Sequence, residues 1–111
     1  MSQRIEKVNE LIKNQLGQII IKELELPENL MITITKVETS PDLKSAKIFI
    51  SVLPENMRGT ALLILTKNAG VLHRALNKLI KIKFTPNLKF FIDEQEIFAE
   101  EVEKILDEIK R

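Results

Sequence analysis

Basic side chains dominate the middle of this sequence. Between Asn56 and Ile92 there is no aspartate or glutamate, and the segment carries seven positive side chains, namely Arg58, Lys67, Arg74, Lys78, Lys81, Lys83 and Lys89. A basic surface without carboxylates attracts phosphate groups, and each phosphate that it neutralises releases condensed counterions. The segment therefore predicts contact with a nucleic-acid backbone, although the formal net charge of the whole chain is only +1.

Part of this charge falls on one face of a predicted helix. On a wheel at about 100° per residue with Lys67 at zero, Arg74, Lys78 and Lys81 lie within about 40° of it. The opposite side holds apolar residues that we expect to be buried, namely Leu62, Leu65, Ala69, Leu72, Leu76 and Leu79. An ordinary solvated helix could show the same basic stripe, so the stripe alone leaves the function open.

Two further features favour a nucleic-acid partner. The basic run continues beyond the helix through Lys83 and Lys89, toward the next predicted strand. Gly70 interrupts the helix near its middle, where a glycine frees backbone groups and lets a polyanion approach closely. We therefore interpret the interruption as functional rather than merely structural.

Groups that could carry catalysis are sparse. His73 is the only histidine, and its position indicates a surface or RNA-side residue rather than a catalytic base. We find no nucleophile motif, no phosphate-cradling glycine loop and no histidine–carboxylate metal spacing. From Asp93 to Arg111, eight carboxylates against three basic residues give a local net charge of about −5. We expect these carboxylates to be solvated, and the protein to be neither an enzyme nor a metal binder; they include Glu100, Glu101, Glu103, Asp107 and Glu108.

Hydrophobic periodicity predicts the elements that position these residues. In chain order, the pattern predicts a helix over 3–25, strands over 30–35 and 46–53, a long helix from 56 or 58 to 80, a strand over 88–93 and a last amphipathic helix. Each element has one apolar side, so we expect an α+β fold with the helices packed on one face of a three-stranded sheet. A length of 111 residues fits a single domain over 1–111.

Four local strings occur in a fixed order along the chain. They are Thr39-Ser40-Pro41-Asp42-Leu43 leading into Ala46-Lys47-Ile48-Phe49-Ile50-Ser51, then Ala69-Gly70-Val71-Leu72-His73-Arg74-Ala75-Leu76, then Thr85-Pro86-Asn87-Leu88-Lys89-Phe90-Phe91-Ile92-Asp93. Together with the order of elements and the interrupted helix, these strings resemble the ribosome-binding factor A family. With the first helix, the resemblance covers nearly the whole chain.

This resemblance implies a type II K-homology fold, in which an alanine-x-glycine kink between two helices replaces the usual glycine-x-x-glycine loop. The matching triplet is Asn68-Ala69-Gly70, whose first residue departs from the family pattern. The resemblance also implies a factor that binds the bacterial small (30S) ribosomal subunit and its rRNA during late maturation. It further implies support of precursor rRNA 5′-end processing, a role in cold adaptation, and release by a partner GTPase. In this reading the RNA phosphates contact Lys67, Arg74, Lys78, Lys81, Lys83 and Lys89.

Alternative interpretations remain open from the sequence. The chain could be a protein-interaction module whose kinked or acidic helix docks a protein, with RNA binding incidental. Phosphate-driven binding would weaken steeply with salt, whereas a mainly apolar protein interface would barely respond. Phenylalanines could also stack on bases, but apolar neighbours favour core positions for most of Phe84, Phe90, Phe91 and Phe98.

Composition also bears on the compartment and the assembly state. The chain has no cysteine, and no stretch approaches the length of apolar residues that a membrane span needs. We therefore expect a cytoplasmic protein. Nothing in the sequence requires a dimer, so we expect a monomer.

Overall fold

The computed structural model describes the backbone of residues 3–80 and 85–110, and the side chains of this part except those of 96–101, 103 and 110. The elements are α1 (Gln3–Glu23), β1 (Met31–Thr39), β2 (Ser45–Leu53), the short 3-10 helix η1 (Glu55–Met57), α2 (Arg58–Lys67), α3 (Ala69–Leu79), β3 (Asn87–Ile92) and α4 (Glu94–Lys110). The predicted order of helices and strands is confirmed, with the long central helix divided into α2 and α3.

The strands form one sheet in the order β1-β2-β3. β1 and β2 are an antiparallel hairpin, whereas β2 and β3 are parallel, with Ile48 beside Phe90 in the register. Parallel neighbours need a crossover connection of a dozen or more residues. The α2–α3 pair supplies it, and this connection places both helices against the sheet.

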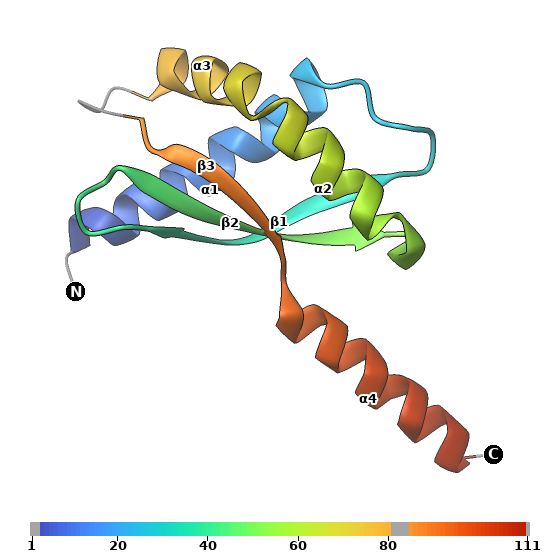
Figure 1. The fold of residues 1–111 in the computed structure, drawn as a ribbon. Helices are drawn as coiled ribbons and strands as arrows, with labels where there is room; N and C mark the ends of the chain where they lie inside the picture. Colours follow the sequence, from blue (N-terminus) through green and yellow to red (C-terminus); the bar gives the residue numbers. More distant parts are fainter. Residues whose placement is uncertain (1–2, 81–84, 111) are drawn as a thin grey trace.

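Three helices cover one side of the sheet (Figure 1). Alternation along β2 sends Ala46, Ile48, Ile50 and Val52 into the core and turns Lys47 and Phe49 to the other side. The core also includes fully buried side chains from the helices, among them Ile12, Leu16, Leu65, Leu72 and Leu76. Burial of each such side chain stabilises the fold by about 1.5–3 kcal/mol. We call the side of the sheet away from α1, α2 and α3 the open face.

A β-bulge in β1 changes which residues reach the open face. The register pairs Ile34 with Ile50 and then Lys36 with Phe49, so Thr35 is the extra residue. Because a bulge shifts the period-two alternation by one residue, Val37 and Thr39 return to the buried side. The sequence pattern ended this strand at 35, but β1 continues to Thr39; the broken alternation explains the error.

The last helix differs from the other three in its packing. Figure 1 shows α4 leaving the end of β3 and extending away from the sheet. Its described apolar side chains are exposed, namely Val102, Ile105, Leu106 and Ile109. Lys104 Nζ lies 3.8 Å from Glu55 Oε2 of η1. No helix in the described part of the chain is both long enough and apolar enough to cross a membrane.

Candidate nucleic-acid interface

Asn68 forms the junction between α2 and α3. Its backbone, at φ −103° and ψ 11°, leaves the helical region and ends α2. The Asn68 side-chain Nδ2 donates to the Ile64 carbonyl at 2.8 Å, and the Asn68 carbonyl accepts from the Leu72 N–H at 3.0 Å. Asn68 therefore supplies a hydrogen-bond donor to the last turn of α2 and a hydrogen-bond acceptor to the first turn of α3.

Gly70 lies just inside α3 in ordinary helical backbone. A Cβ added there would come no closer than 3.6 Å to a described neighbour, the Arg74 Nη1 atom. The bend at the junction is therefore set by Asn68 and not by a conformation that only glycine can adopt. What the glycine contributes is a bare backbone beside the Arg74 guanidinium.

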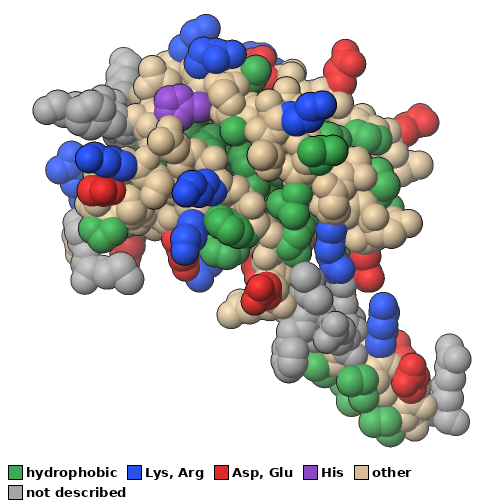
Figure 2. All heavy atoms as spheres, in the orientation of Figure 1, with side chains coloured by type: hydrophobic (Ala, Val, Ile, Leu, Met, Phe, Trp, Pro, Cys, Tyr) green, Lys and Arg blue, Asp and Glu red, His purple; other side chains and the backbone are tan. Residues whose placement is uncertain are grey.

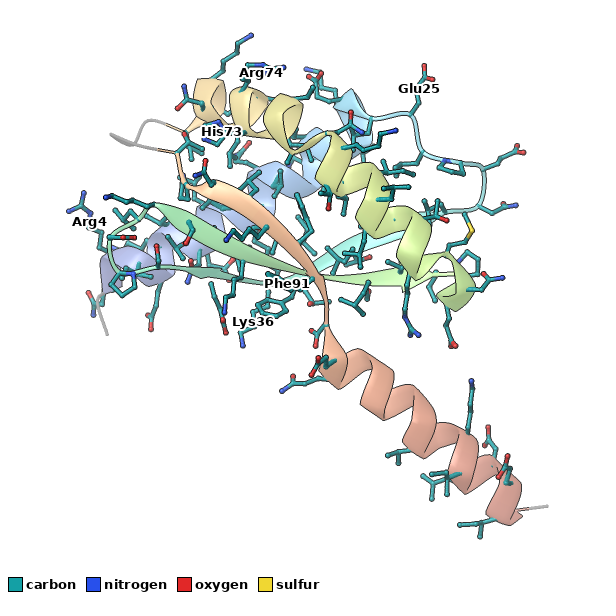
Figure 3. All side chains as sticks on the ribbon, viewed as in Figure 1. Arg4, Glu25, Lys36, His73, Arg74 and Phe91 are labelled. Atoms are coloured by element: carbon teal, nitrogen blue, oxygen red, sulfur yellow. The ribbon has the colours of Figure 1, made fainter. Side chains whose placement is uncertain are left out.

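A basic cluster lies where α1 and α3 meet. Arg74 and Lys78, one turn apart on α3, line a shallow hollow of about 320 Å³ together with Lys22 of α1. All three side chains are exposed, and we call them the helix cluster. Glu23 lines the same hollow, so the local charge of these four side chains is +2. Figure 2 shows lysine and arginine side chains along the upper edge of the molecule near His73, and Figure 3 labels Arg74 on that edge.

The predicted basic stripe is divided by the structure. Lys67 is exposed on the last turn of α2, before the break at Asn68, and it does not line the hollow that Arg74 and Lys78 share with Lys22. Leu79, expected in the buried stripe, is 56 % exposed at the last residue of α3. Lys81 and Lys83 lie outside the described residues.

Lys89 lies on the opposite side of the molecule from the helix cluster. β3 buries Leu88 and turns Lys89 and Phe91 to the open face. In Figure 3, Phe91 lies below the sheet, whereas Arg74 lies above it. Lys89, expected near the basic residues of the helix, therefore lies apart from the helix cluster, because strand alternation sends its side chain away from the helices.

His73 faces a loop rather than solvent alone. It is half-buried, and its Nε2 atom lies 2.9 Å from the Thr85 carbonyl oxygen. The Thr85 hydroxyl in turn donates to Asn77 Oδ1 at 2.6 Å. Two side chains of α3 thus hold the segment that enters β3, which gives the only histidine a structural contact.

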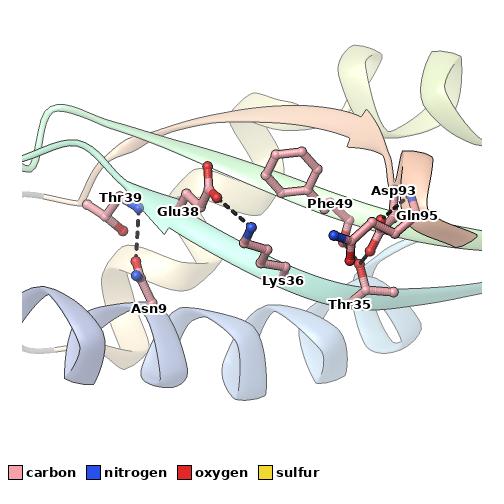
Figure 4. Close-up of polar contacts among 8 residues, drawn as sticks. All are labelled: Asn9, Thr35, Lys36, Glu38, Thr39, Phe49, Asp93 and Gln95. Atoms are coloured by element: carbon pink, nitrogen blue, oxygen red, sulfur yellow. Dashed lines mark hydrogen bonds and ion pairs between the residues drawn. The ribbon is translucent and has the colours of Figure 1, made fainter.

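The open face carries a second group of basic and aromatic side chains. Lys47 and Lys89 are register partners, and so are Phe49 and Phe91. The two rings have centroids 5.8 Å apart and planes inclined by 31°. Lys36 Nζ lies 5.5 Å from the Phe49 centroid and 2.7 Å from Glu38 Oε1 (Figure 4). The Glu38 carboxylate raises the pKa of the Lys36 ammonium.

Several of these residues were not predicted from the sequence. Lys22 lies outside the segment from Asn56 to Ile92 that has no acidic residue. The sequence did place it near the end of the first predicted helix. Lys47 and Phe49 occupy the outer positions of the second predicted strand, and the alternation there could have placed them together on the open face. The position of Lys36 on the open face could not be predicted, because the bulge shifts the alternation of β1.

Metal chemistry has no support in the described part of the chain. No group of three or more histidine, aspartate or glutamate side chains there is placed to hold a metal ion. Glu100, Glu101 and Glu103 of the acidic segment lie outside the described side chains, while Asp107 and Glu108 are exposed. What the geometry offers is surfaces for anion and base contact.

The chain is similar to known proteins in sequence. The family model described as Ribosome-binding factor A matches residues 4–106. A relative from Brevibacillus brevis, named ribosome-binding factor A, is 36% identical over 107 residues, which cover 96% of this chain and 88% of the relative.

Solved structures of the same name share the fold. The crystal structure of ribosome-binding factor A from Thermus thermophilus superposes with a TM-score of 0.72 at 23% identity, covering 79% of this chain and 93% of that one. A Thermus thermophilus homology model fitted into the cryo-EM map of a 30S complex gives a TM-score of 0.65 at 24% identity, over 75% and 88%. The predicted α+β, K-homology-like fold is thereby confirmed. The sequence matches show that this chain belongs to the ribosome-binding factor A family.

Proposed function

We propose that this protein is a non-enzymatic factor that binds the small ribosomal subunit and its rRNA through the helix cluster. The observation that carries the proposal is the meeting of Lys22, Arg74 and Lys78 at one hollow between α1 and α3. Exposed cations on rigid helices suit the fixed phosphate positions of a folded RNA. The 30S complex described for the Thermus thermophilus protein supports the choice of subunit.

The junction at Asn68 extends this surface. Ala69, Gly70 and Arg74 line a second hollow of about 250 Å³ with His73 and Asn87. Arg74 borders both hollows, so one guanidinium can contact phosphates approaching from either side. Its planar group forms bidentate contacts to phosphate. Arg74 is therefore the residue on which the proposed docking most depends, with Lys67 as a peripheral contact.

The finer biological assignment rests on family resemblance. We propose that the factor acts in the cytoplasm during late maturation of the subunit, supports processing of the rRNA 5′ end, and leaves with the help of a maturation GTPase. A role in cold adaptation belongs to the same proposal. Binding at the α1–α3 surface would let the protein hold the rRNA in one arrangement without chemistry of its own.

Co-sedimentation with purified small and large subunits tests the docking surface. Arg74→Glu combined with Lys78→Glu should weaken small-subunit binding at least about tenfold and make it less salt-dependent, because each phosphate that is no longer neutralised flattens the salt slope by about one. The control is Lys7→Glu with Lys44→Glu, which makes the same change in net charge at two exposed lysines outside the cluster. Equally weakened binding in both variants would show that only net charge matters and would refute the assignment.

Salt also separates this proposal from a protein-docking adaptor. The adaptor interpretation has one structural observation in its favour, the exposed apolar side chains of α4. Binding that persists at high salt and survives the Arg74 and Lys78 reversals would favour that interpretation.

A further inference from the structure

The open face holds a pair of like charges that the fold itself does not explain. Lys47 and Lys89 lie side by side on neighbouring strands, and both are exposed. Like charges placed opposite each other in a sheet destabilise it. Glu38 is the register partner of Lys47 on β1, but its carboxylate lies 2.7 Å from Lys36 Nζ. These four side chains carry a net charge of +2, which favours an anionic ligand.

Aromatic rings follow the lysines on the same two strands. Phe49 and Phe91 come two residues further on, about 7 Å along the strands at 3.3 Å per residue. Lys36 Nζ lies over the Phe49 ring, whereas the Phe91 side chain is 40% exposed. Phe91 therefore offers a ring to a stacking partner, and the Lys36 ammonium lies over the neighbouring Phe49 ring.

A hollow adjoins these rings at the end of β3. It measures about 460 Å³. Its lining includes Lys36, Phe49, Phe91, Asp93 and Gln95, and also Phe90, Ile92 and, from α2, Leu62. Ligand sites for small molecules span about 300–1,000 Å³. The Gln95 amide can donate and accept hydrogen bonds, whereas Asp93 and Glu94 repel phosphate. The open face thus has a basic end at Lys47 and Lys89 and a polar end at Gln95.

We infer that the open face is a second RNA site, which takes a single-stranded segment with a phosphate on Lys47 and Lys89 and a base on Phe91. Stacking on a protein ring requires an unpaired, accessible base, so duplex RNA does not fit. A second copy of the chain would set lysines against lysines. The inference rests on the proposed function only in naming RNA as the ligand, because the helix cluster lies on the other side of the sheet.

The test measures fluorescence anisotropy of a labelled ten-nucleotide single-stranded RNA of mixed sequence, and of a duplex of equal length. Phe91→Leu should weaken single-strand binding about tenfold, within the range of base–aromatic stacking, and Phe91→Tyr should restore it. Lys47→Gln with Lys89→Gln should flatten the logarithmic salt slope by about 0.7 for each phosphate that is no longer neutralised. Ile21→Ala, at an apolar side chain 77% exposed on α1, is the matched control, and circular dichroism checks that each variant is folded.

The outcomes separate this site from the helix cluster. Loss of single-strand binding in the open-face variants, with binding retained in Arg74→Glu/Lys78→Glu, supports the inference even if subunit docking is disproved. Unchanged single-strand binding in folded Phe91→Leu and Lys47→Gln/Lys89→Gln variants overturns it and leaves the open face to a protein partner. Equal loss of duplex binding also overturns it, because stacking would then not be the cause.

Discussion

Thr35 and Asp93 lie 58 residues apart in the chain, and the Thr35 hydroxyl donates a hydrogen bond of 2.7 Å to the Asp93 carboxylate (Figure 4). The other carboxylate oxygen accepts from the Gln95 N–H at 3.0 Å, as the N-cap of α4. The Asp93 N–H donates to the Ile50 carbonyl at 2.8 Å. The β1 bulge, the central strand and the start of α4 are thus tied together at one residue, Asp93.

Loss of the Thr35 hydroxyl should therefore loosen the start of α4. We expect Thr35→Val to lower the free energy of unfolding by about 1 kcal/mol, the usual contribution of one such bond. Urea unfolding measures the decrease, and faster amide exchange at Gln95 locates it. Thr33→Val is the control, since Thr33 is exposed on the same strand. An equal effect of both variants would show that valine itself, and not the bond to Asp93, changes the stability.

The sequence predicted local patterns better than the contacts that join them. Periodicity placed the strand alternation and the helices, because those depend on residues a few positions apart. The Thr35–Asp93 bond depends on a bulge, and the division of the basic surface depends on which side of β3 faces the helices. Neither the bond nor this division can be predicted from residues that are close together in the sequence. For α4, an apolar stripe predicted a helix correctly but carried no information about what the stripe packs against.

Asn68 has a structural role at the junction of α2 and α3. Asn68→Ala removes the 2.8 Å bond to the Ile64 carbonyl at a half-buried position, so we expect a decrease of about 1 kcal/mol in the free energy of unfolding. Asn14→Ala is the contrasting control, because Asn14 is exposed within α1 and alanine is the better helix former there. Chemical denaturation should show a lower free energy of unfolding for Asn68→Ala and a higher one for Asn14→Ala. A higher free energy of unfolding in both variants would mean that helix propensity outweighs the hydrogen bond from Asn68 to the Ile64 carbonyl.

Gly70 offers a test in which stability and RNA binding move in opposite directions. Both Gly70→Ala and Gly17→Ala are sterically tolerated, with the nearest atom at 3.6 Å in the first and nothing within 4 Å in the second. Each should raise the free energy of unfolding by about 0.5–1 kcal/mol. If RNA approaches the bare backbone beside Arg74, only Gly70→Ala should weaken subunit binding in the co-sedimentation assay. Binding unaffected by both changes would contradict a close approach at the junction.

Asp42 makes the hairpin between β1 and β2 sensitive to acid. The Ser40 hydroxyl donates to Asp42 Oδ1 at 2.6 Å and the Lys44 N–H donates to the same oxygen at 3.0 Å. These bonds, the Ser40 hydroxyl foremost, lower the pKa of the Asp42 carboxyl from its ordinary 3.8. A carboxyl with a lowered pKa adds stability above its unfolded value and loses it as the pH falls through its folded value.

The stability difference between the natural chain and Asp42→Asn should therefore be constant above about pH 5 and shrink below pH 3.8, where the unfolded carboxyl becomes protonated. Urea unfolding between about pH 2.5 and about pH 6 measures this difference. Ser40→Ala removes the main cause of the shift, so an NMR titration should find the Asp42 pKa closer to 3.8 in that variant. A stability difference that grows in acid would reverse the sign required by a lowered pKa and would rule out this account of the turn.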